Sequence, residues 1–354
     1  MQLIFDWYRG MVEPATGSLA YLYDPELERV VVDGSLIRDI AAIWDIEVLG
    51  DFLGRDELQR VTTRALDRFQ ALVVTSSRGS VVTPSDEPAT IGHNAVLILA
   101  LARSHRADRA ERALPLAEAI LRQQRRDGSY QATFDAGVEG GAEDLSPAEA
   151  MLALLESFGL TGDARFLDSV ERSFRYYRLS YFDRGRVAPE TLVFFANWQS
   201  QAGRMLCEST TRAETRRFVA TYLCELHDRI AEAGFYDDLA RFPFAQACVE
   251  VACALEGVSD AFAVAALVNS DRADAFRSYA QRALSLLIAA QRTVGCTPRE
   301  RGGFGYSLED RTQRVDVTGH AASGFIKCLE NGIVRPERPV GLVTGGEQPW
   351  HGTT

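Results

Sequence analysis

Asp316 and His320 form a pair of residues in this chain that could act together in acid/base chemistry. They are four residues apart at the start of an apolar stretch, 317–329. Residues spaced by four share one face of a helix, so a carboxylate and an imidazole can form an acid/base couple there. His93, beside Asn94 at the start of a second apolar stretch, is another candidate proton carrier.

Further carboxylates and aromatic residues extend this set. Acid/base chemistry on a polyhydroxylated substrate needs one group that protonates a leaving oxygen and a second that acts on the opposite face. Aromatic side chains stack on the apolar faces of sugar rings. We predict catalytic roles for Asp316, His320, His93, Asp144, Glu143 and Asp237. We predict substrate binding by Arg38, Asn94, Trp198, Gln201, Tyr236, Asp238 and Glu149.

Several of these candidates also have a structural explanation. Ser146-Pro147-Ala148-Glu149 has the pattern of a capping box, in which Glu149 stabilises the start of a helix. Asp316 can be an N-cap, and a histidine such as His320 is often a hydrogen-bonded core residue. Asp237 and Asp238 are adjacent, so repulsion can raise the pKa of one of them, although a solvated turn explains the pair equally well.

The helices that must position these residues fall into two classes. Six stretches are apolar on most faces, as buried helices are: 36–48, 93–102, 147–158, 192–207, 244–255 and 317–329. Five stretches carry an apolar stripe with Arg and Glu elsewhere, as helices facing solvent do: 58–72, 110–123, 164–177, 213–230 and 273–290. We expect the first class to form an inner ring and the second an outer ring. The sixth outer position is either filled by N-terminal residues or left open.

The connections between these helices alternate in length. Short turns join the two members of a pair, and long connections join one pair to the next at 76–92, 125–145, 178–189, 233–242 and 293–315. Helical hairpins cannot bury their apolar faces alone, so they stack side by side. If they alternate up and down, every long connection lies at one end of the stack, where function usually sits.

We therefore predict an all-α fold, an (α/α)6-type toroid over residues 35–335. Residues 1–34 are the least helical part of the chain, and we expect them to form a lid or brace with short extended pieces near Tyr21 and Val30. Residues 336–354 are rich in Pro, Gly and Thr, which predicts an irregular tail.

Composition narrows the possible partners. The net charge of −11 disfavours nucleic acid and anionic membranes. No stretch approaches the roughly 20 apolar residues of a membrane span, and the N-terminus lacks the pattern of a signal peptide. The six cysteines form no Cys-x-x-Cys pair and read as small buried residues in a reducing compartment. We expect a cytoplasmic protein without a metal or other cofactor.

One segment carries a family resemblance. Gln124, Gly128 and Tyr130 resemble the repeat of terpenoid cyclases and protein prenyltransferases, in which Gln, Gly and an aromatic residue follow one another at these spacings; a weaker copy begins at Gln291. The segment 148–163 is similar to six-hairpin glycosidases and sugar epimerases. All these groups share an α/α toroid, so the resemblance implies this architecture. The Asp-x-Asp-Asp motif of terpene cyclases is absent, and Asp237-Asp238-Leu239-Ala240-Arg241 has Arg where metal-dependent terpene synthases have an acid.

From the residues and the resemblance we expect a soluble enzyme with general acid/base chemistry on a small carbohydrate or oligosaccharide, by hydrolysis or by isomerisation or epimerisation. A terpenoid cyclase-like enzyme would instead have a cavity walled by aromatic residues, with few carboxylates. A non-catalytic binding scaffold would be an open superhelix with an unfilled groove.

Overall fold

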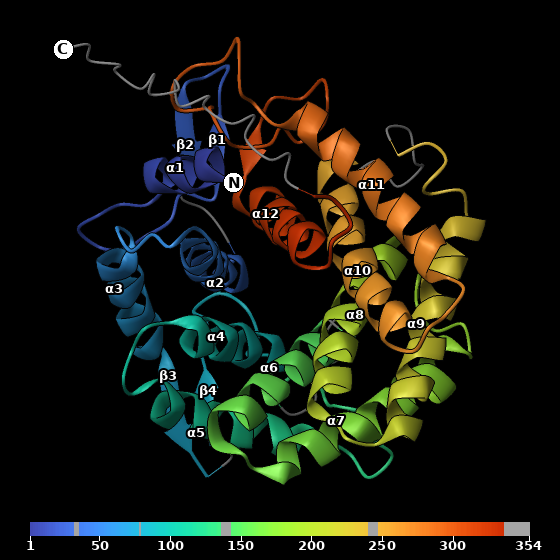
Figure 1. The fold of residues 1–354 in the computed structure, drawn as a ribbon. Coiled ribbons are helices and arrows are strands. Elements are labelled where there is room, and N and C mark those ends of the chain that lie inside the picture. The colour runs from blue at the N-terminus through green and yellow to red at the C-terminus, as the bar shows by residue number, and fades with distance from the viewer. Residues whose placement is uncertain (32–34, 78, 136–142, 240–246, 336–354) are drawn as a thin grey trace, which may run out of the picture.

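Six helices stand side by side around one axis in the computed structural model, which describes residues 1–31, 35–77, 79–135, 143–239 and 247–335. Each inner helix contacts the next one, and the last contacts the first, so the ring is closed (Figure 1). The inner helices are α2 (Leu36–Leu53), α4 (Ile91–Arg103), α6 (Ser146–Thr161), α8 (Leu192–Ser209), α10 (Ala247–Leu267) and α12 (Val315–Glu330). The predicted inner ring is confirmed.

A second layer of helices surrounds this ring. It consists of α1 (Gln2–Met11), α3 (Gln59–Gln70), α5 (Arg109–Gln123), α7 (Ala164–Tyr176), α9 (Ala213–Glu232) and α11 (Ala273–Ala290). The two layers differ as their sequences predict. Every residue from Ile91 to Ala102 of α4 is buried, whereas α7 buries only one stripe that includes Phe166, Val170 and Phe174. None of the described helices is long and apolar enough to cross a membrane.

The N-terminal segment closes the outer ring. We expected residues 1–34 to be the least helical part, but α1 packs between α2 and α12 and fills the sixth outer position. Trp7 of α1 donates a hydrogen bond of 2.7 Å to the Gln313 side chain, which ties the start of the chain to its last long connection. The extended pieces that we expected are confirmed as β1 (Leu22–Asp24) and β2 (Arg29–Val31).

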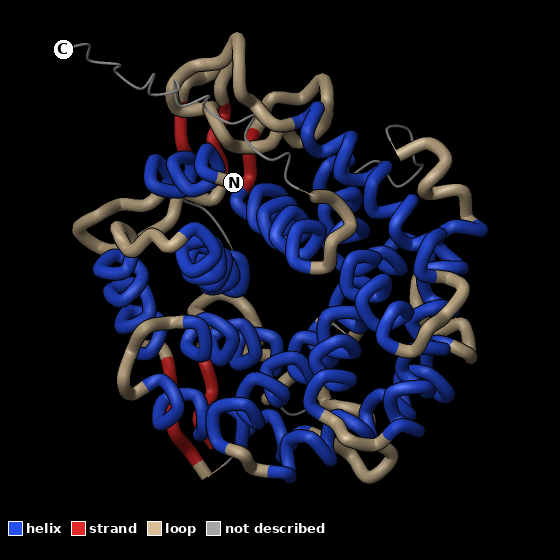
Figure 2. The backbone as a smooth tube through the Cα atoms, in the orientation of Figure 1, coloured by secondary structure: helices blue, strands red, loops and turns tan. Residues whose placement is uncertain are grey.

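The long connections meet at one end of the toroid, as predicted. β1 pairs with both β2 and β5 (Gln313–Arg314), which joins the N-terminal segment to the last long connection. Thr90 and Thr133 form a bridge between two other long connections. The connection that contains Thr90 also holds the hairpin of β3 (Val73–Ser76) and β4 (Gly79–Val82), drawn in red in Figure 2. After α7, the chain continues through a π-helical turn (Tyr177–Phe182) and a 3₁₀ turn (Pro189–Thr191) into α8.

The Gln/Gly/aromatic segment joins neighbouring outer helices. The Gln124 amide ends α5 and donates to Ser169 and Ser173 of α7 at 2.8 and 2.7 Å, and the Tyr130 hydroxyl lies 3.0 Å from that of Ser169. The weaker copy makes the same kind of joint between α11 and α1. There, Gly302 has a φ of +105°, and a Cβ on it would come within 1.9 Å of the Leu3 carbonyl oxygen of α1.

Some helix boundaries differ from those that we predicted. The predicted inner helix 244–255 begins partly outside the described residues, and α10 continues to Leu267, well beyond the predicted end. The predicted capping box at Glu149 does not form, because Ser146 is already helical and the N-cap is Leu145. Asp316 is likewise no N-cap, since Arg314 holds that position. Asp163 is the N-cap of α7, and its side chain accepts a hydrogen bond from the Arg165 backbone.

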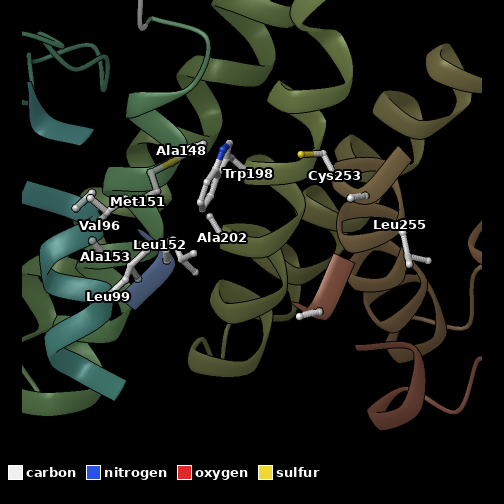
Figure 3. Close-up of a cluster of buried hydrophobic side chains, with 14 of the residues drawn as sticks. Val96, Leu99, Ala148, Met151, Leu152, Ala153, Trp198, Ala202, Cys253 and Leu255 are labelled. Atoms are coloured by element: carbon white, nitrogen blue, oxygen red, sulfur yellow. The ribbon is translucent and has the colours of Figure 1, made fainter. Parts of the chain in front are cut away.

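Packing between the inner helices forms the core of the protein. Figure 3 shows part of it, a cluster that runs across α4, α6, α8 and α10 and includes Val96, Met151, Trp198 and Cys253. Since these side chains interlock in a closed ring, the polar groups that point from the same helices toward the axis are held in fixed positions.

The α11–α1 joint provides the first testable prediction. Gly302→Ala places a Cβ against the Leu3 carbonyl and forces an unfavourable φ, so we expect it to lower the free energy of unfolding by about 3 kcal/mol or more. Gly295→Ala is the matched control: its φ is +64° but a Cβ there has open space, so only the backbone penalty of about 1 kcal/mol remains. Equal losses for both variants in urea unfolding would show that the joint does not close the ring.

Candidate active site

A buried carboxylate lies at the centre of the inner ring. Glu256 of α10 has 1% of its side chain exposed. Its Oε2 accepts hydrogen bonds from Asn197 of α8 and from His320 of α12, both at 2.9 Å. Its Oε1 accepts from the Ser323 hydroxyl and from Lys327, whose Nζ lies 3.4 Å away. Burial alone would raise the pKa of Glu256, but Lys327 and His320 outweigh burial and lower it to about 2.

His320 is charged because of this carboxylate. Burial disfavours the imidazolium, but contacts with Cys253 and Glu256 raise the pKa of His320 well above its usual value. Burial raises the pKa of Cys253, so its thiol is neutral at pH 7. The charge of Glu256 is therefore what stabilises the charged form of His320. The His320 side chain nevertheless keeps 23% of its surface accessible, so part of the ring faces open space.

Two tryptophans lie next to His320. The Trp198 indole of α8 meets the imidazole edge-on, with ring centroids 6.1 Å apart. Trp44 of α2 stacks on Trp198 at 6.3 Å. Stacked indoles beside an imidazole provide the flat apolar surface on which a sugar ring can lie.

Asp45 of α2 is a second candidate proton carrier, and it lies next to His320. Its Oδ2 packs against Gly319, the residue before His320, where a Cβ would approach it to 1.8 Å. The Tyr8 hydroxyl lies 3.4 Å from the same oxygen. Burial raises the pKa of Asp45 to about 7, although the charge of His320 lowers it in part. At neutral pH this carboxyl group can therefore either accept or donate a proton.

Two more carboxyl groups are buried near the starts of inner helices. Burial raises the pKa of Glu149 to about 7, opposed by a hydrogen bond from Ser146 and by the charge of His320. Burial alone raises the pKa of Glu250, in the first turn of α10, to about 7. The Glu149 Oε2 atom is buried without a hydrogen-bond partner and lies against Gly92. Such an arrangement is unfavourable for a charged carboxylate, and it indicates a functional role for Glu149 rather than a structural one.

Charged groups also gather where α12 begins. Asp316 forms an ion pair with Arg314 and lies 3.5 Å from Arg38 of α2. Both guanidinium groups also lie over the Tyr21 ring. The structure thus brings the predicted residues Arg38 and Asp316 together at the end where the long connections meet.

Asp144 and Glu143 precede α6 at the same end. The Asp144 carboxylate accepts hydrogen bonds from Tyr181, at 2.6 Å, and from Thr191. It therefore fixes the connection that leads into α8. Glu143 is exposed.

His93 and Asn94 make hydrogen bonds to the connection before α4 and to the neighbouring helix α5. His93 is part of a capping box with Thr90, and its Nε2 atom lies 3.1 Å from Glu87. Asn94 accepts from the Val82 backbone at 2.9 Å and donates to two backbone carbonyls. These bonds hold β4 and α5 against α4, so we do not include the two residues in the proposed site.

Tyr236, Asp237 and Asp238 lie against the outer helix α11. Tyr236 stacks on Tyr279 with centroids 4.4 Å apart, and Asp237 pairs with Arg282 at 3.4 Å. Asp237 and Asp238 are both exposed. The contacts of Tyr236 and Asp237 are with α11 rather than with the cluster around His320, so we leave all three residues out of the proposed site as well.

A cavity of about 200 Å³ lies on the axis beyond Glu256. The predicted residue Gln201 lines it, together with Trp44 and Ser323. Gln201 donates to Asn197 at 3.3 Å and so contacts the group that holds Glu256. Among the residues that the structure describes, no three His, Cys, Asp or Glu side chains gather where one metal ion could bind them.

Comparison with known proteins identifies the architecture. No family model matches the chain, and no curated protein matches it in sequence. Solved structures do match over most of its length. The chain has the (α/α)6 toroid fold.

Three of these structures show the extent of the match. A D-mannose isomerase has a TM-score of 0.64 at 11% identity, covering 92% of this chain and 95% of its own. The cellobiose 2-epimerase from Bacillus thermoamylovorans has a TM-score of 0.64 at 10% identity, covering 91% and 95%. An unsaturated glucuronyl hydrolase specific for heparin has a TM-score of 0.62 at 10% identity, covering 92% and 94%.

Sequence reasoning missed Asp45, Glu250, Glu256 and Lys327, although a signal was present. Asp45 and Glu256 are acidic residues within largely apolar helices of the inner ring. A charged residue in that position must be paired or must face a cavity. For Glu256 the signal was hidden, because we ended the predicted helix at Leu255.

The buried Glu149 carboxyl group, whose Oε2 atom has no hydrogen-bond partner, provides a stability test. Its pKa is about 7 in the folded protein and near 4.5 when unfolded, so the folded state holds the extra proton and stability falls as pH rises from about 4.5 to 7. We expect Glu149→Gln to raise the free energy of unfolding by about 2–3 kcal/mol at pH 8, and to change it little at pH 4.5.

Denaturant unfolding at several pH values measures this difference. Glu214→Gln is the control, because the Glu214 side chain is 82% exposed and its loss should change stability little at any pH. A Glu149→Gln difference that does not depend on pH would mean that this carboxyl group has an ordinary pKa.

Proposed function

We propose that this chain is an enzyme that moves protons to and from a carbohydrate-like substrate bound on the axis of the toroid. One observation carries the proposal. His320 is held by Glu256 as a charged acid, and it lies beside Asp45, whose carboxyl group is poised near neutral pH. A proton donor and a proton acceptor on two neighbouring inner helices are what such chemistry requires.

The other groups of the site support a sugar as the substrate. Trp198 offers an apolar surface next to His320, and the gathered carboxylates and arginines can bind hydroxyl groups. The similar solved structures include a sugar isomerase, sugar epimerases and glycoside hydrolases. The conditions that we set for the two alternatives are not met. The carboxyl groups of Asp45, Glu149 and Glu256 interact with His320, whereas a terpenoid site would have few carboxylates. The ring is closed, whereas a binding scaffold would be an open superhelix.

Of the two sugar chemistries, the geometry favours isomerisation or epimerisation. Glu256 occupies Nδ1 of His320, and we assign proton exchange with a substrate oxygen to Nε2. Asp45 can remove a proton from the carbon next to a sugar carbonyl while His320 protonates the carbonyl oxygen, which gives an enediol. In the second half, Asp45 returns its proton to the neighbouring carbon, which gives isomerisation, or to the other face of the same carbon after the enediol turns, which gives epimerisation. In both cases His320 takes back a proton from the enediol hydroxyl that becomes the new carbonyl. Hydrolysis would instead require two carboxyl groups facing each other across the bond.

Activity assays test this proposal directly. The protein is incubated in D₂O with a panel of free aldoses and ketoses, and exchange of the C2 hydrogen is followed by NMR; aryl glycosides test hydrolysis. We expect C2 exchange with at least one sugar, and we expect His320→Asn and Asp45→Asn each to reduce the rate by roughly 10²–10⁴-fold while circular dichroism shows that both remain folded. His320→Asn also removes a partner of buried Glu256, so its melting temperature should fall, and rates are compared well below it. Asp316→Asn should raise KM more than it lowers kcat.

The matched control is His105→Asn. His105 is exposed and pairs with Asp51 on the surface, so its replacement should leave the rate unchanged. Hydrolysis without C2 exchange would move the proposal to glycoside hydrolysis. Wild-type rates in His320→Asn, or no reaction with any sugar of the panel, would overturn it.

The pH profile provides a separate test of Asp45. If its ionised form is the base, kcat/KM rises with pH through about 7 and then stays level until His320 loses its proton. Removing the Tyr8 hydroxyl removes a hydrogen bond that lowers the pKa of Asp45. We therefore expect Tyr8→Phe to shift this limb of the profile to higher pH. A profile that does not move, or that falls through pH 7, would rule out Asp45 as the base.

A further inference from the structure

The cavity beyond Glu256 opens at the end of the toroid opposite the long connections. All six inner helices contribute to its wall. Arg103 is the last residue of α4, Glu330 is the last residue of α12, and Glu208 is next to last in α8. Since inner helices end where the short turns begin, we call this space the short-turn cavity.

Charged side chains line this cavity in pairs. Arg103 lies 2.7 Å from Glu156, and Arg204 lies 3.0 Å from both Glu208 and Asp260. Lys327 lies 2.7 Å from Asp260. Because each cation is matched by a carboxylate, the wall offers many hydrogen-bond donors and acceptors but little net charge.

Such a wall selects for an uncharged ligand with several hydroxyl groups. A hydroxyl can donate to a carboxylate and accept from a guanidinium or ammonium group without breaking the pair. An anion would meet the carboxylates Glu156, Glu208, Asp260 and Glu330, and a cation would meet Arg103, Arg204 and Lys327. Trp44 and Leu152 add an apolar surface for the carbon face of a sugar.

The size of the cavity limits the ligand further. Its volume of about 200 Å³ is below the roughly 300–1,000 Å³ of pockets for drug-sized ligands, so the ligand is no larger than one sugar ring.

This cavity is connected to the proposed active site by direct hydrogen bonds. Ser323 and Lys327 line it, and both donate to the Oε1 atom of Glu256. The Oε2 atom of the same carboxylate holds His320. A ligand that bonds to Ser323 or Lys327 therefore changes the charge that Glu256 presents to the imidazole.

We propose that the short-turn cavity is a second binding site, for an uncharged monosaccharide-sized polyol, and that its occupancy is transmitted to His320 through Glu256. This site goes beyond the proposed function, since binding there requires no turnover.

Binding to a cavity-filled variant tests the site. Met205 lines the cavity, and Met205→Trp should fill it; Leu179→Trp adds the same side chain at an exposed position of the outer surface and is the matched control. The probes are methyl glycosides of common hexoses, which cannot isomerise, with glucuronate and glucosamine as charged counterparts. Calorimetry and ligand-observed NMR measure the affinities, and circular dichroism checks the fold.

We expect at least one methyl glycoside to bind the wild type and Leu179→Trp equally, and to bind Met205→Trp at least about tenfold more weakly. The charged sugars should bind the wild type about tenfold more weakly than the neutral one. Equal binding to Met205→Trp, or no binding of any methyl glycoside to the wild type, would overturn the site. Tighter binding of a charged sugar would overturn the ligand class.

The coupling to His320 has its own readout. In the wild type, saturation with the glycoside should shift the His320 ring signals, which His320→Asn identifies by their loss. Lys327→Met removes one of the two bonds between cavity and carboxylate and should reduce that shift. Binding without any change of the His320 signals would show that the two sites are independent. Because these measurements need no substrate turnover, they stay informative even if the activity assays fail.

Discussion

The Glu256 carboxylate is the charge around which the interior of this toroid is arranged. A carboxylate out of contact with water is strongly unfavourable unless hydrogen bonds and opposite charges surround it. Asn197, His320, Ser323 and Lys327 provide these, and they come from α8 and α12, the two inner helices that flank α10. The carboxylate therefore requires all three helices in fixed positions, and the closed ring supplies that constraint.

Closure of the ring depends in turn on the outer layer. The same kind of backbone joint links α5 to α7 and α11 to α1, far apart in the sequence. The last long connection also pairs with β1 and bonds to Trp7 of α1, so the two ends of the repeat are fastened to each other. His320 and Asp45 are neighbours only because α12 and α2 are held together in this way, since 275 residues of chain separate them in the sequence.

Much of this architecture could be predicted because it follows from helix periodicity. Helices such as α4, buried on every face, and α7, buried on one stripe, differ plainly in their sequences. Helix α1 could not be predicted in the same way, because it is one isolated segment followed by strands, and its place depends on contacts with Gly302 and Gln313 at the far end of the chain. The end of α10 was missed because Glu256 and Asp260 interrupt its apolar sequence, and their partners lie on other helices.

The candidate site was predictable in part for a related reason. Asp316, His320, Trp198 and Glu149 stand near the starts of inner helices or one to two turns along them, so the stacking rule brings them toward the axis. The same rule brought in His93 and Asn94, but the His93 side chain turns to Thr90 and Glu87 and the Asn94 side chain turns to β4. Whether such a side chain faces the axis or turns away from it depends on which neighbouring element offers it a hydrogen-bond partner.

Asp45, Glu149 and Glu250 form a group that stability alone does not explain. Burial raises the pKa of each to about 7, so at neutral pH the fold holds carboxyl groups that favour the neutral form. Glu256, equally buried, shows that the same fold can hold a carboxylate with full compensation. The difference between them is therefore one of partners rather than of depth. Carboxyl groups with too few partners to offset their burial remain able to exchange protons with a ligand, whereas Glu256 is bound too tightly to do so and acts by fixing His320.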